Sequence, residues 1–489
     1  MKVKENNIKN KIMSGLFWKF FERILAQGVS FLVSVVLARL LTPNDYGIVA
    51  IILIFISLAD VFVTSGFSTA LVQNKNATIK DFSTNFYCSL FVSIVIYMVL
   101  FFLAPVISKF YNSPELCLVL RVFALRIPLS AFSAIQHAYV ERNMLFKKYF
   151  FSTLFGTLVS GVVGVILAYF GFGVWALVAQ YLTNTFIDIV VLLITVPWKP
   201  TLEFSYNSAV KMMKYGWKIF VADFAGTFFE QLRSIIIGKA YTSADLAFYN
   251  KGNQLPTLIT SNVGSSIMSV LFPAMANFND DLEKVKYITK RAVKIMAYVM
   301  FPLLFGLAAV SKPLVEFLFT DRWIMAVPYV RILSIAYAIS LIGSISLQAI
   351  KAIGRSDILL KLEIIKKPVY FLLLIIGMKI SVIAVALTMG IYNIYGAIVN
   401  ASALKSVIKY DYKSQLKDLL PALFLSGIMF IIVLSLQNIP LSPIFVILIQ
   451  LIVGVAVYII LSVITKQESF SEIINILKKE VKKRNEKQN

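Results

Sequence analysis

The stretch RLLTPNDYGI, residues 39–48, has a counterpart 200 positions later in KAYTSADLAFY, residues 239–249. In both stretches a basic residue is followed by a threonine three positions on and by an aspartate six positions on. The preceding segments correspond as well, since WKFF begins at Trp18 and WKIF begins at Trp217. Each match is weak alone, but matches in the same order along the chain predict an internal repeat.

A further match supports the repeat. LRVFALRIPLSAF at Leu120 is similar to VRILSIAYAISLI at Val330, and this alignment pairs Arg121 with Arg331. The two halves of the chain are therefore predicted to be copies of one unit.

The composition places this unit in a membrane. The 489 residues are 59% hydrophobic and only 15% charged, and the mean hydropathy is +0.81, which is too apolar for one soluble core. The apolar runs are about 20 residues long, enough to cross a hydrocarbon layer as helices, whereas barrel strands alternate over about ten residues. We predict an all-α integral membrane protein with about 14 transmembrane helices, at residues 12–40, 46–71, 83–108, 116–140, 150–171, 174–196, 217–240, 246–275, 293–318, 325–350, 358–378, 381–404, 420–437 and 443–465.

The repeat organises these spans into two six-helix lobes with a pseudo-twofold relation. After six spans the chain is back on the side of the membrane where it began, so the second copy has the same orientation as the first. Parallel repeats of this kind form a substrate site at their interface. The predicted domains are an N-terminal lobe at 1–200, a C-terminal lobe at 201–418, two additional helices at 419–466 and a basic cytoplasmic amphipathic tail at 467–489. Two interpretations of this last segment remain, a helix that lies on the membrane surface and a solvated basic tail.

Lysine and arginine set the orientation. They concentrate in the tail and in alternate loops, so the positive-inside rule places both termini in the cytoplasm. The same asymmetry accounts for most of the net charge of +22, which is therefore weak evidence for an anionic ligand, and no nucleic-acid partner is expected.

Polar residues recur at helical spacing inside four spans. In the first span, Lys19, Arg23 and Gln27 share one side of a helix, and Asp223 and Glu230 lie 200 positions after Arg23 and Ser30. Charges at the bilayer centre are costly, about 2.5–3.5 kcal/mol, and usually face a cavity or a partner. Mutual pairing and snorkelling to the interface are the competing interpretations. The candidate site residues are Glu22, Arg23, Gln27, Asp60, Arg126, Asp223, Glu230, Arg233, Asn250, Lys251 and Gln254.

Other titratable residues are given structural roles. The single histidine, His137, is interpreted as a polar interface residue, and Asp188 is interpreted as isolated. The two cysteines, Cys88 and Cys117, fit no disulfide or metal spacing and are expected to pack inertly.

No motif for catalysis or nucleotide binding stands out. The GKA at Gly238 lacks the glycine spacing and the hydroxyl residue of a phosphate-binding loop, and no metal or nucleophile motif is present. The predicted outer loops are short, which disfavours a membrane glycosyltransferase. We expect a transporter rather than an enzyme, without a metal or cofactor and without direct use of ATP.

The segment SVVLARLLTPNDYGIVAIILIFISLADVFVTSGFSTALVQ, residues 34–73, resembles the start of polysaccharide-export flippases of the Wzx type. These belong to the multidrug/oligosaccharidyl-lipid/polysaccharide exporter superfamily. The turns ERNMLFKKYF at Glu141 and IKAIGRSDILLKL at Ile350 support the resemblance, which covers nearly the whole chain.

The resemblance implies a V-shaped bundle whose first, second, seventh and eighth helices line a central cavity. It implies that the protein lies in the bacterial cytoplasmic membrane and turns undecaprenyl-diphosphate-linked oligosaccharide repeat units to the outer leaflet by alternating access. H⁺ or Na⁺ coupling and a polysaccharide polymerase or export complex are further implied partners.

In that setting, the candidates have separate roles. Cations would neutralise the diphosphate and amides would bind sugar hydroxyls. The binding candidates are then Arg23, Gln27, Arg126, Arg233, Asn250, Lys251 and Gln254, while Glu22, Asp60, Asp223 and Glu230 would serve ion coupling or charge pairing.

Alternatives stay open at this point. A drug or cation antiporter of the same superfamily would favour acidic cavity residues without nearby arginines, and a lipid II flippase is a second variant. A polytopic glycosyltransferase and a structural partner of a polymerase are outside alternatives.

Overall fold

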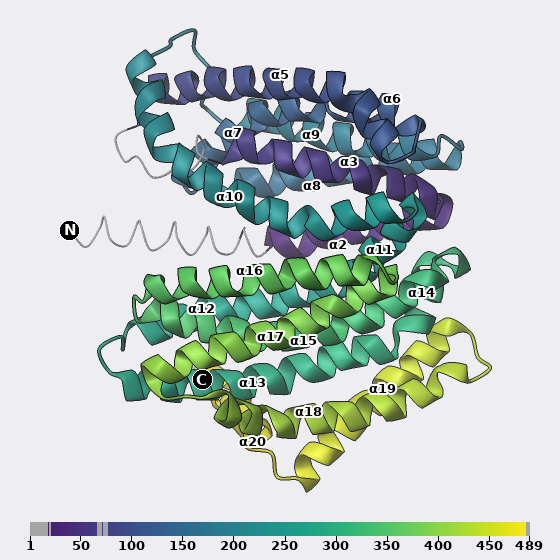
Figure 1. Ribbon diagram of the computed structural model, residues 1–489, viewed down its shortest axis with the longest axis vertical. Coiled ribbons are helices and arrows are strands. Elements are labelled where there is room, and N and C mark those ends of the chain that lie inside the picture. The colour runs from purple at the N-terminus through teal and green to yellow at the C-terminus, as the bar shows by residue number, and fades with distance from the viewer. Residues whose placement is uncertain (1–17, 19–20, 66–70, 72–76, 486–489) are drawn as a thin grey trace. The chain divides into compact units, whose positions relative to one another are not determined.

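The computed structural model describes residue 18 and residues 21–65, 71 and 77–485 (Figure 1). Within these residues the secondary structure is entirely helical. The chain divides into two compact units, Met1–Ala247 and Phe248–Asn489. This division falls later than the lobe boundary predicted at residue 200, because α10 (Tyr206–Ala240) packs on helices of unit 1.

Unit 1 consists of long helices joined by short turns. Its π-helical first segment η1 runs straight into α2, and α11 begins within the unit and continues into unit 2. The helices are η1 (Glu22–Ala26), α2 (Gln27–Leu40), α3 (Pro43–Thr64), α5 (Ile79–Phe110), α6 (Glu115–Phe123), α7 (Arg126–Arg142), α8 (Phe146–Tyr169), α9 (Val174–Thr195), α10 (Tyr206–Ala240) and α11 (Ser243–Ile259).

Unit 2 has a core built around α13, α15 and α18. Its helices are η2 (Thr260–Gly264), α12 (Ser265–Ala276), α13 (Leu282–Ala309), α14 (Ser311–Phe319), η3 (Asp321–Ala326), α15 (Val327–Ala352), α16 (Ser356–Met378), α17 (Val382–Ile408), α18 (Tyr412–Ser435), η4 (Leu436–Asn438), α19 (Pro443–Ile464) and α20 (Glu468–Asn485).

Eleven helical segments among the described residues are long and apolar enough to cross a membrane. The fourteen predicted spans all overlap helices, but three fall outside this set. The segment Ile24–Leu40 is short, and α10 and α16 carry several charged residues. The all-helical membrane fold is confirmed, and the number of fourteen spans stays a prediction.

One predicted span is wrong in detail. The span predicted at 293–318 ends as a helix at Ala309, and residues Ser311–Phe319 form the separate helix α14. The end of α13 was missed although two polar residues and a proline, Ser311, Lys312 and Pro313, follow it closely. The span predicted at 116–140 matches the apolar segment Glu115–Arg142, which contains a short irregular turn between α6 and α7.

The internal repeat is visible in two helix caps. At the start of α3, the Thr42 backbone N–H donates to the Asp45 carboxylate over 2.9 Å, and Asp45 N–H donates to Thr42 Oγ1 over 3.3 Å. At the start of α11, the Thr242 and Asp245 bonds match, at 3.1 Å each. This reciprocal capping satisfies N–H groups that a helix start leaves unpaired. The threonine–aspartate spacing is thus repeated because each copy begins a helix there.

The second matched pair is also repeated in the structure. Arg121 donates from Nε to the Phe101 carbonyl over 3.2 Å, and Arg331 donates from Nε to Ser311 Oγ over 3.0 Å. Each arginine therefore reaches a residue 20 positions earlier in its own unit. Arg331 also donates to Gln437 Oε1 over 2.6 Å, which ties the segment between α18 and α19 to α15.

Candidate functional site

A helix break inside unit 1 brings charged residues together. The helix α6 ends at Phe123 and α7 begins at Arg126, within a 28-residue apolar segment that could span a membrane. Pro128 lies in the first turn of α7, where its missing N–H costs nothing. Ala124 and Leu125 keep backbone angles close to those of a helix, so the segment is locally distorted rather than unwound.

Arg126 is paired with a carboxylate from another helix. Its Nη1 lies 3.6 Å from Asp60 Oδ2 on α3, and Ser130 Oγ donates to Asp60 Oδ1 over 3.3 Å. The side chains of Arg126 and Asp60 are 27% and 24% exposed, so the pair is only partly buried. The Arg126–Asp60 pair unites two of the predicted site residues, and it agrees with the mutual-pairing interpretation. An arginine shared with a protein carboxylate can change partner when a stronger anion arrives.

An aromatic ring completes this cluster. The Arg126 guanidinium carbon lies 5.9 Å from the centre of the Tyr181 ring on α9, within cation–π range. The Phe123 ring packs on the same tyrosine at 5.2 Å. Neither Ser130 nor Tyr181 was predicted, because both lie in helices whose sequence gives no sign of a contact with Arg126.

Lys251 is held differently, in unit 2. The residue is only 5% exposed, and its Nζ lies 5.0 Å from the Phe319 ring centre and 5.7 Å from that of Trp323. Its Nζ also donates to Gln254 Oε1 over 3.3 Å, so two predicted site residues meet on one helix face. The two aromatic rings make cation–π interactions with the ammonium group, which partly replace the hydration that it loses on burial.

The remaining predicted residues lie on α10, α2 and neighbouring segments. Asp223 and Glu230 are exposed on α10, and Gln27 is exposed on α2. Glu22, Arg233 and Asn250 are half-buried, whereas the side chain of Arg23 and the whole of Lys19 lie outside the described residues. Exposed carboxylates within long helices of a membrane protein are consistent with a wet helix face.

The isolated position predicted for Asp188 is wrong. Asp188 Oδ2 lies 2.9 Å from His137 Nε2, and this contact joins α9 to α7. The Tyr149 ring of α8 packs against the imidazole at 4.8 Å. His137 thus lies at an interface of three helices. Among the described residues, no group of three or more His, Cys, Asp or Glu side chains is arranged to hold a metal.

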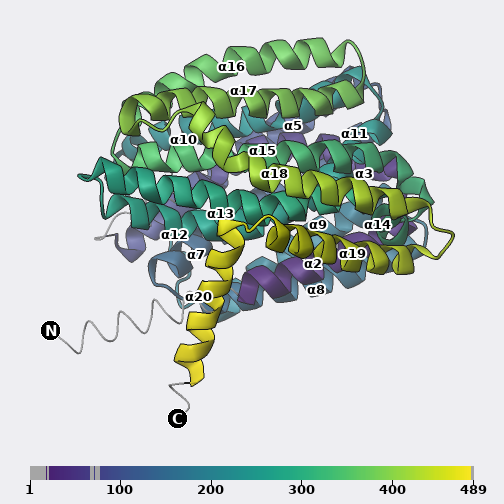
Figure 2. The ribbon, with the colours of Figure 1, turned by 90° about the horizontal axis from the view of Figure 1, so that it is seen from below.

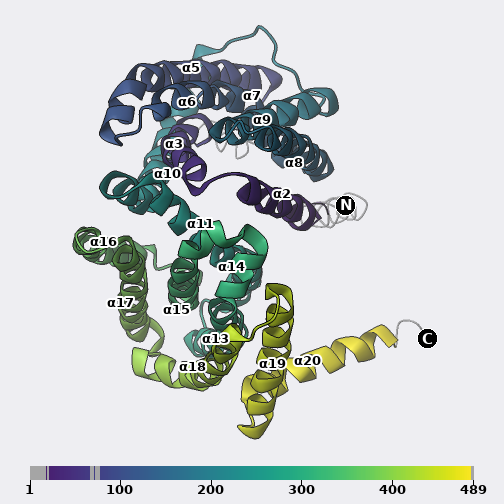
Figure 3. The same ribbon diagram turned by 90° about the vertical axis from the view of Figure 1, so that its right-hand side faces the viewer.

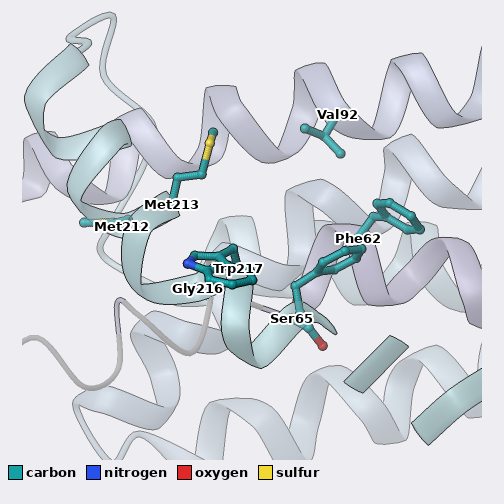
Figure 4. Close-up of a pocket in the computed structure, with 8 residues that line it drawn as sticks. Phe62, Ser65, Val92, Met212, Met213, Gly216 and Trp217 are labelled. Carbon is teal, nitrogen blue, oxygen red and sulfur yellow. The ribbon is translucent and has the colours of Figure 1, made fainter. Parts of the chain in front are cut away.

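Unit 1 also contains an apolar pocket of about 170 Å³ between α3, α5 and α10 (Figure 4). Phe62, Val92, Met213, Trp217 and Phe220 contribute to its wall. None of the predicted site residues lines it. The polar site around Arg126 and this apolar pocket are therefore separate features of the same unit.

The fold matches membrane transporters. The chain superposes on the lipid II flippase MurJ in an inward closed conformation with a TM-score of 0.73 and 18% identity, covering 93% of this chain and 99% of MurJ. An inward-facing multidrug resistance MATE family transporter of the MOP superfamily gives a TM-score of 0.60 and 16% identity, over 79% and 94% of the two chains. At these identities the likeness shows the fold alone: the chain has the same helical architecture as these two proteins.

The family follows from the sequence. The family model described as polysaccharide biosynthesis protein matches residues 36–328, and the chain belongs to this family. The resemblance noted from the 34–73 segment is confirmed. The chain is 23% identical to the succinoglycan biosynthesis transport protein ExoT of Rhizobium meliloti, over 70% of this chain and 69% of ExoT.

Two further relatives cover more of the chain. The lipopolysaccharide biosynthesis protein WzxC of Escherichia coli is 22% identical over 78% of both chains. The teichuronic acid biosynthesis protein TuaB of Bacillus subtilis is 23% identical over 87% of this chain and 89% of TuaB. The names of these two relatives refer to biosynthesis of lipopolysaccharide and of teichuronic acid.

Proposed function

We propose that this protein is a flippase that moves undecaprenyl-diphosphate-linked oligosaccharide repeat units from the cytoplasmic to the outer leaflet of the bacterial cytoplasmic membrane. The family match over residues 36–328 carries the proposal. The transporter fold supports it, and so does the paired arginine within the apolar segment of unit 1. The product serves surface polysaccharide biosynthesis, as an O-antigen, a capsule or an exopolysaccharide.

The movement follows alternating access by two six-helix lobes with two additional helices, and both termini are cytoplasmic. The distribution of lysine and arginine between alternate loops supports this orientation. No ATP is consumed within the chain, and a gradient of H⁺ or Na⁺ is the proposed driving force. A polysaccharide polymerase or export complex would take up the product.

Arg126 is the proposed diphosphate contact with the best-defined geometry. In the structure it pairs with Asp60 and keeps about a quarter of its side chain exposed. A diphosphate carries more negative charge than one carboxylate and accepts two parallel N–H bonds from a guanidinium. The incoming substrate would therefore displace Asp60 from Arg126. The other predicted binding residues are proposed to act at the same substrate, with the amides Gln27, Asn250 and Gln254 contacting sugar hydroxyls.

The test is export by variants in the native host after deletion of its chromosomal copy. Arg126→Ala should reduce surface polysaccharide about tenfold or more, because a charge-assisted hydrogen bond contributes roughly 1.5–3 kcal/mol. Arg126→Lys should restore part of the activity. Arg322→Ala is the matched control, because Arg322 is an exposed arginine in η3 of unit 2.

Protein level in the membrane is measured for each variant. Full polysaccharide with Arg126→Ala at a normal protein level would exclude Arg126 from the transport path. Loss of export by Arg322→Ala to the same extent would show that the assay does not report on the site.

A further inference from the structure

The last helix, α20 (Glu468–Asn485), differs in direction from the helices that precede it. It follows α19, which ends at Ile464, after a short turn at residues 465–467. Figures 2 and 3 show that α20 runs crosswise to α19 rather than alongside it. Because α19 is long and apolar enough to span a membrane, a helix that runs crosswise from its end would lie along the surface of that membrane.

The first turns of α20 are fixed to unit 2. Lys294 of α13 donates from Nζ to Glu468 Oε2 over 2.7 Å, and Arg291 of α13 forms an ion pair with Glu472. The side chains of Phe470 and Ile473 pack against the apolar core of unit 2. The hydrogen bond from Lys294 also holds the pKa of Glu468 below its ordinary value. These contacts set the direction in which the remainder of the helix leaves the protein.

The second half of α20 is amphipathic. Residues spaced by three or four positions share one helix face, so Ile474, Leu477 and Val481 continue the face that begins with Phe470 and Ile473. The same half contains one carboxylate, Glu480, and five cations. The cations are Lys478, Lys479, Lys482, Lys483 and Arg484. Lys478 is exposed.

We propose that the second half of α20 is a lipid-binding helix that lies in the headgroup layer and binds anionic phospholipids. An apolar stripe beside several lysines, on a helix lying in the membrane plane, is the pattern of an interfacial helix. Clusters of four to eight cations next to a transmembrane helix bind anionic lipid headgroups. The backbone of α20 directly follows α19, so this helix begins next to the end of a candidate membrane span. A solvated tail and a protein partner are the alternatives that the test separates.

The experiment uses the full-length protein in lipid nanodiscs. A spin label is attached to Val481→Cys, with Cys88 and Cys117 replaced by alanine, and its collisions with oxygen and with a water-soluble nickel complex are compared. In nanodiscs of phosphatidylcholine and phosphatidylglycerol, oxygen collisions should dominate, because Val481 enters the acyl boundary. In pure phosphatidylcholine the ratio of oxygen to nickel collisions should fall several-fold, since the electrostatic attraction is lost.

A matched pair of triple variants tests the role of the charges. Lys478→Gln, Lys482→Gln and Lys483→Gln together should lower the collision ratio in phosphatidylglycerol nanodiscs to its value in pure phosphatidylcholine. The control, Lys405→Gln, Lys413→Gln and Lys417→Gln, removes the same charge from exposed lysines of α17 and α18 and should leave the ratio unchanged. A label at Ile473→Cys checks in every sample that the start of α20 is still docked.

Two results would overturn the proposal. A Val481 label that meets the nickel complex equally in both lipid mixtures would show a solvated tail. A label shielded from both reagents, whatever the lipid and in all variants, would show that protein covers this face.

Discussion

At the scale of single residues, two pairs of titratable side chains within unit 1 join neighbouring helices. Asp60 and Arg126 join α3 to α7, and His137 and Asp188 join α7 to α9. A charge within a membrane costs about 2.5–3.5 kcal/mol by insertion scales, so such pairs offset a large penalty. Each pair also contacts a tyrosine from a third helix, Tyr181 beside Arg126 and Tyr149 beside His137.

We therefore expect the His137–Asp188 contact to stabilise unit 1. Asp188→Ala and His137→Ala should each lower the thermal unfolding temperature of the purified protein in detergent. In a double-mutant cycle the two should show a coupling energy of roughly 0.5–3 kcal/mol, because each substitution removes the same contact. Additive effects of the two substitutions would show that the contact contributes nothing to stability.

The sequence predicted part of this residue-level organisation. Asp60 and Arg126 could be identified because a charge in an apolar run is conspicuous in one dimension. Their pairing, the hydroxyl of Ser130 and the partner of Asp188 could not be identified, because these contacts join residues 51 to 70 positions apart. No local spacing encodes such a contact. It depends on which helix faces meet after packing.

At the scale of helices, hydropathy locates the apolar segments but does not give the residues at which helices begin and end. The predicted repeat anticipated the caps of α3 and α11, because capping residues have a fixed local spacing. The separate helix α14 was not anticipated, although Ser311, Lys312 and Pro313 lie at its start. A prediction based mainly on the length of apolar runs therefore misplaced this helix end.

Gly47 in the first turn of α3 shows how closely two of these helix starts approach. A Cβ atom built on Gly47 would lie 2.0 Å from the carbonyl oxygen of Ser243, the first residue of α11. The Ser243 hydroxyl also bonds to the Asn44 side chain. The close approach of the two backbones is thus possible only with glycine at this position.

Gly47→Ala should accordingly lower the unfolding free energy by about 1–3 kcal/mol, because a backbone carbonyl cannot move aside as a flexible side chain can. Gly226→Ala is the matched control in the interior of α10, where a Cβ would meet nothing within 4 Å. That variant should be neutral or more stable by about 0.5–1 kcal/mol. Equal unfolding temperatures for the two variants in detergent would contradict the predicted clash.

At the scale of the whole molecule, the chain combines the fold of the lipid II flippase MurJ with membership of a polysaccharide biosynthesis family. The fold class and the family could both be recognised from the sequence, since the length of apolar runs and the 34–73 segment are local features. The identity of the cargo rests on the family, because the fold alone serves substrates as different as drugs and lipid-linked sugars. The proposed exchange of Asp60 for a diphosphate at Arg126 links the fold to that cargo.

The most direct test of this account is flipping by the purified protein in liposomes. The liposomes contain undecaprenyl-diphosphate-linked oligosaccharide with a fluorescent sugar, and a membrane-impermeant quencher reports how much of it reaches the outer leaflet. The account predicts faster transbilayer movement than in protein-free liposomes, without ATP and slowed by Arg126→Ala. A rate equal to that of protein-free liposomes under every imposed ion gradient, or movement that strictly requires ATP hydrolysis, would contradict it.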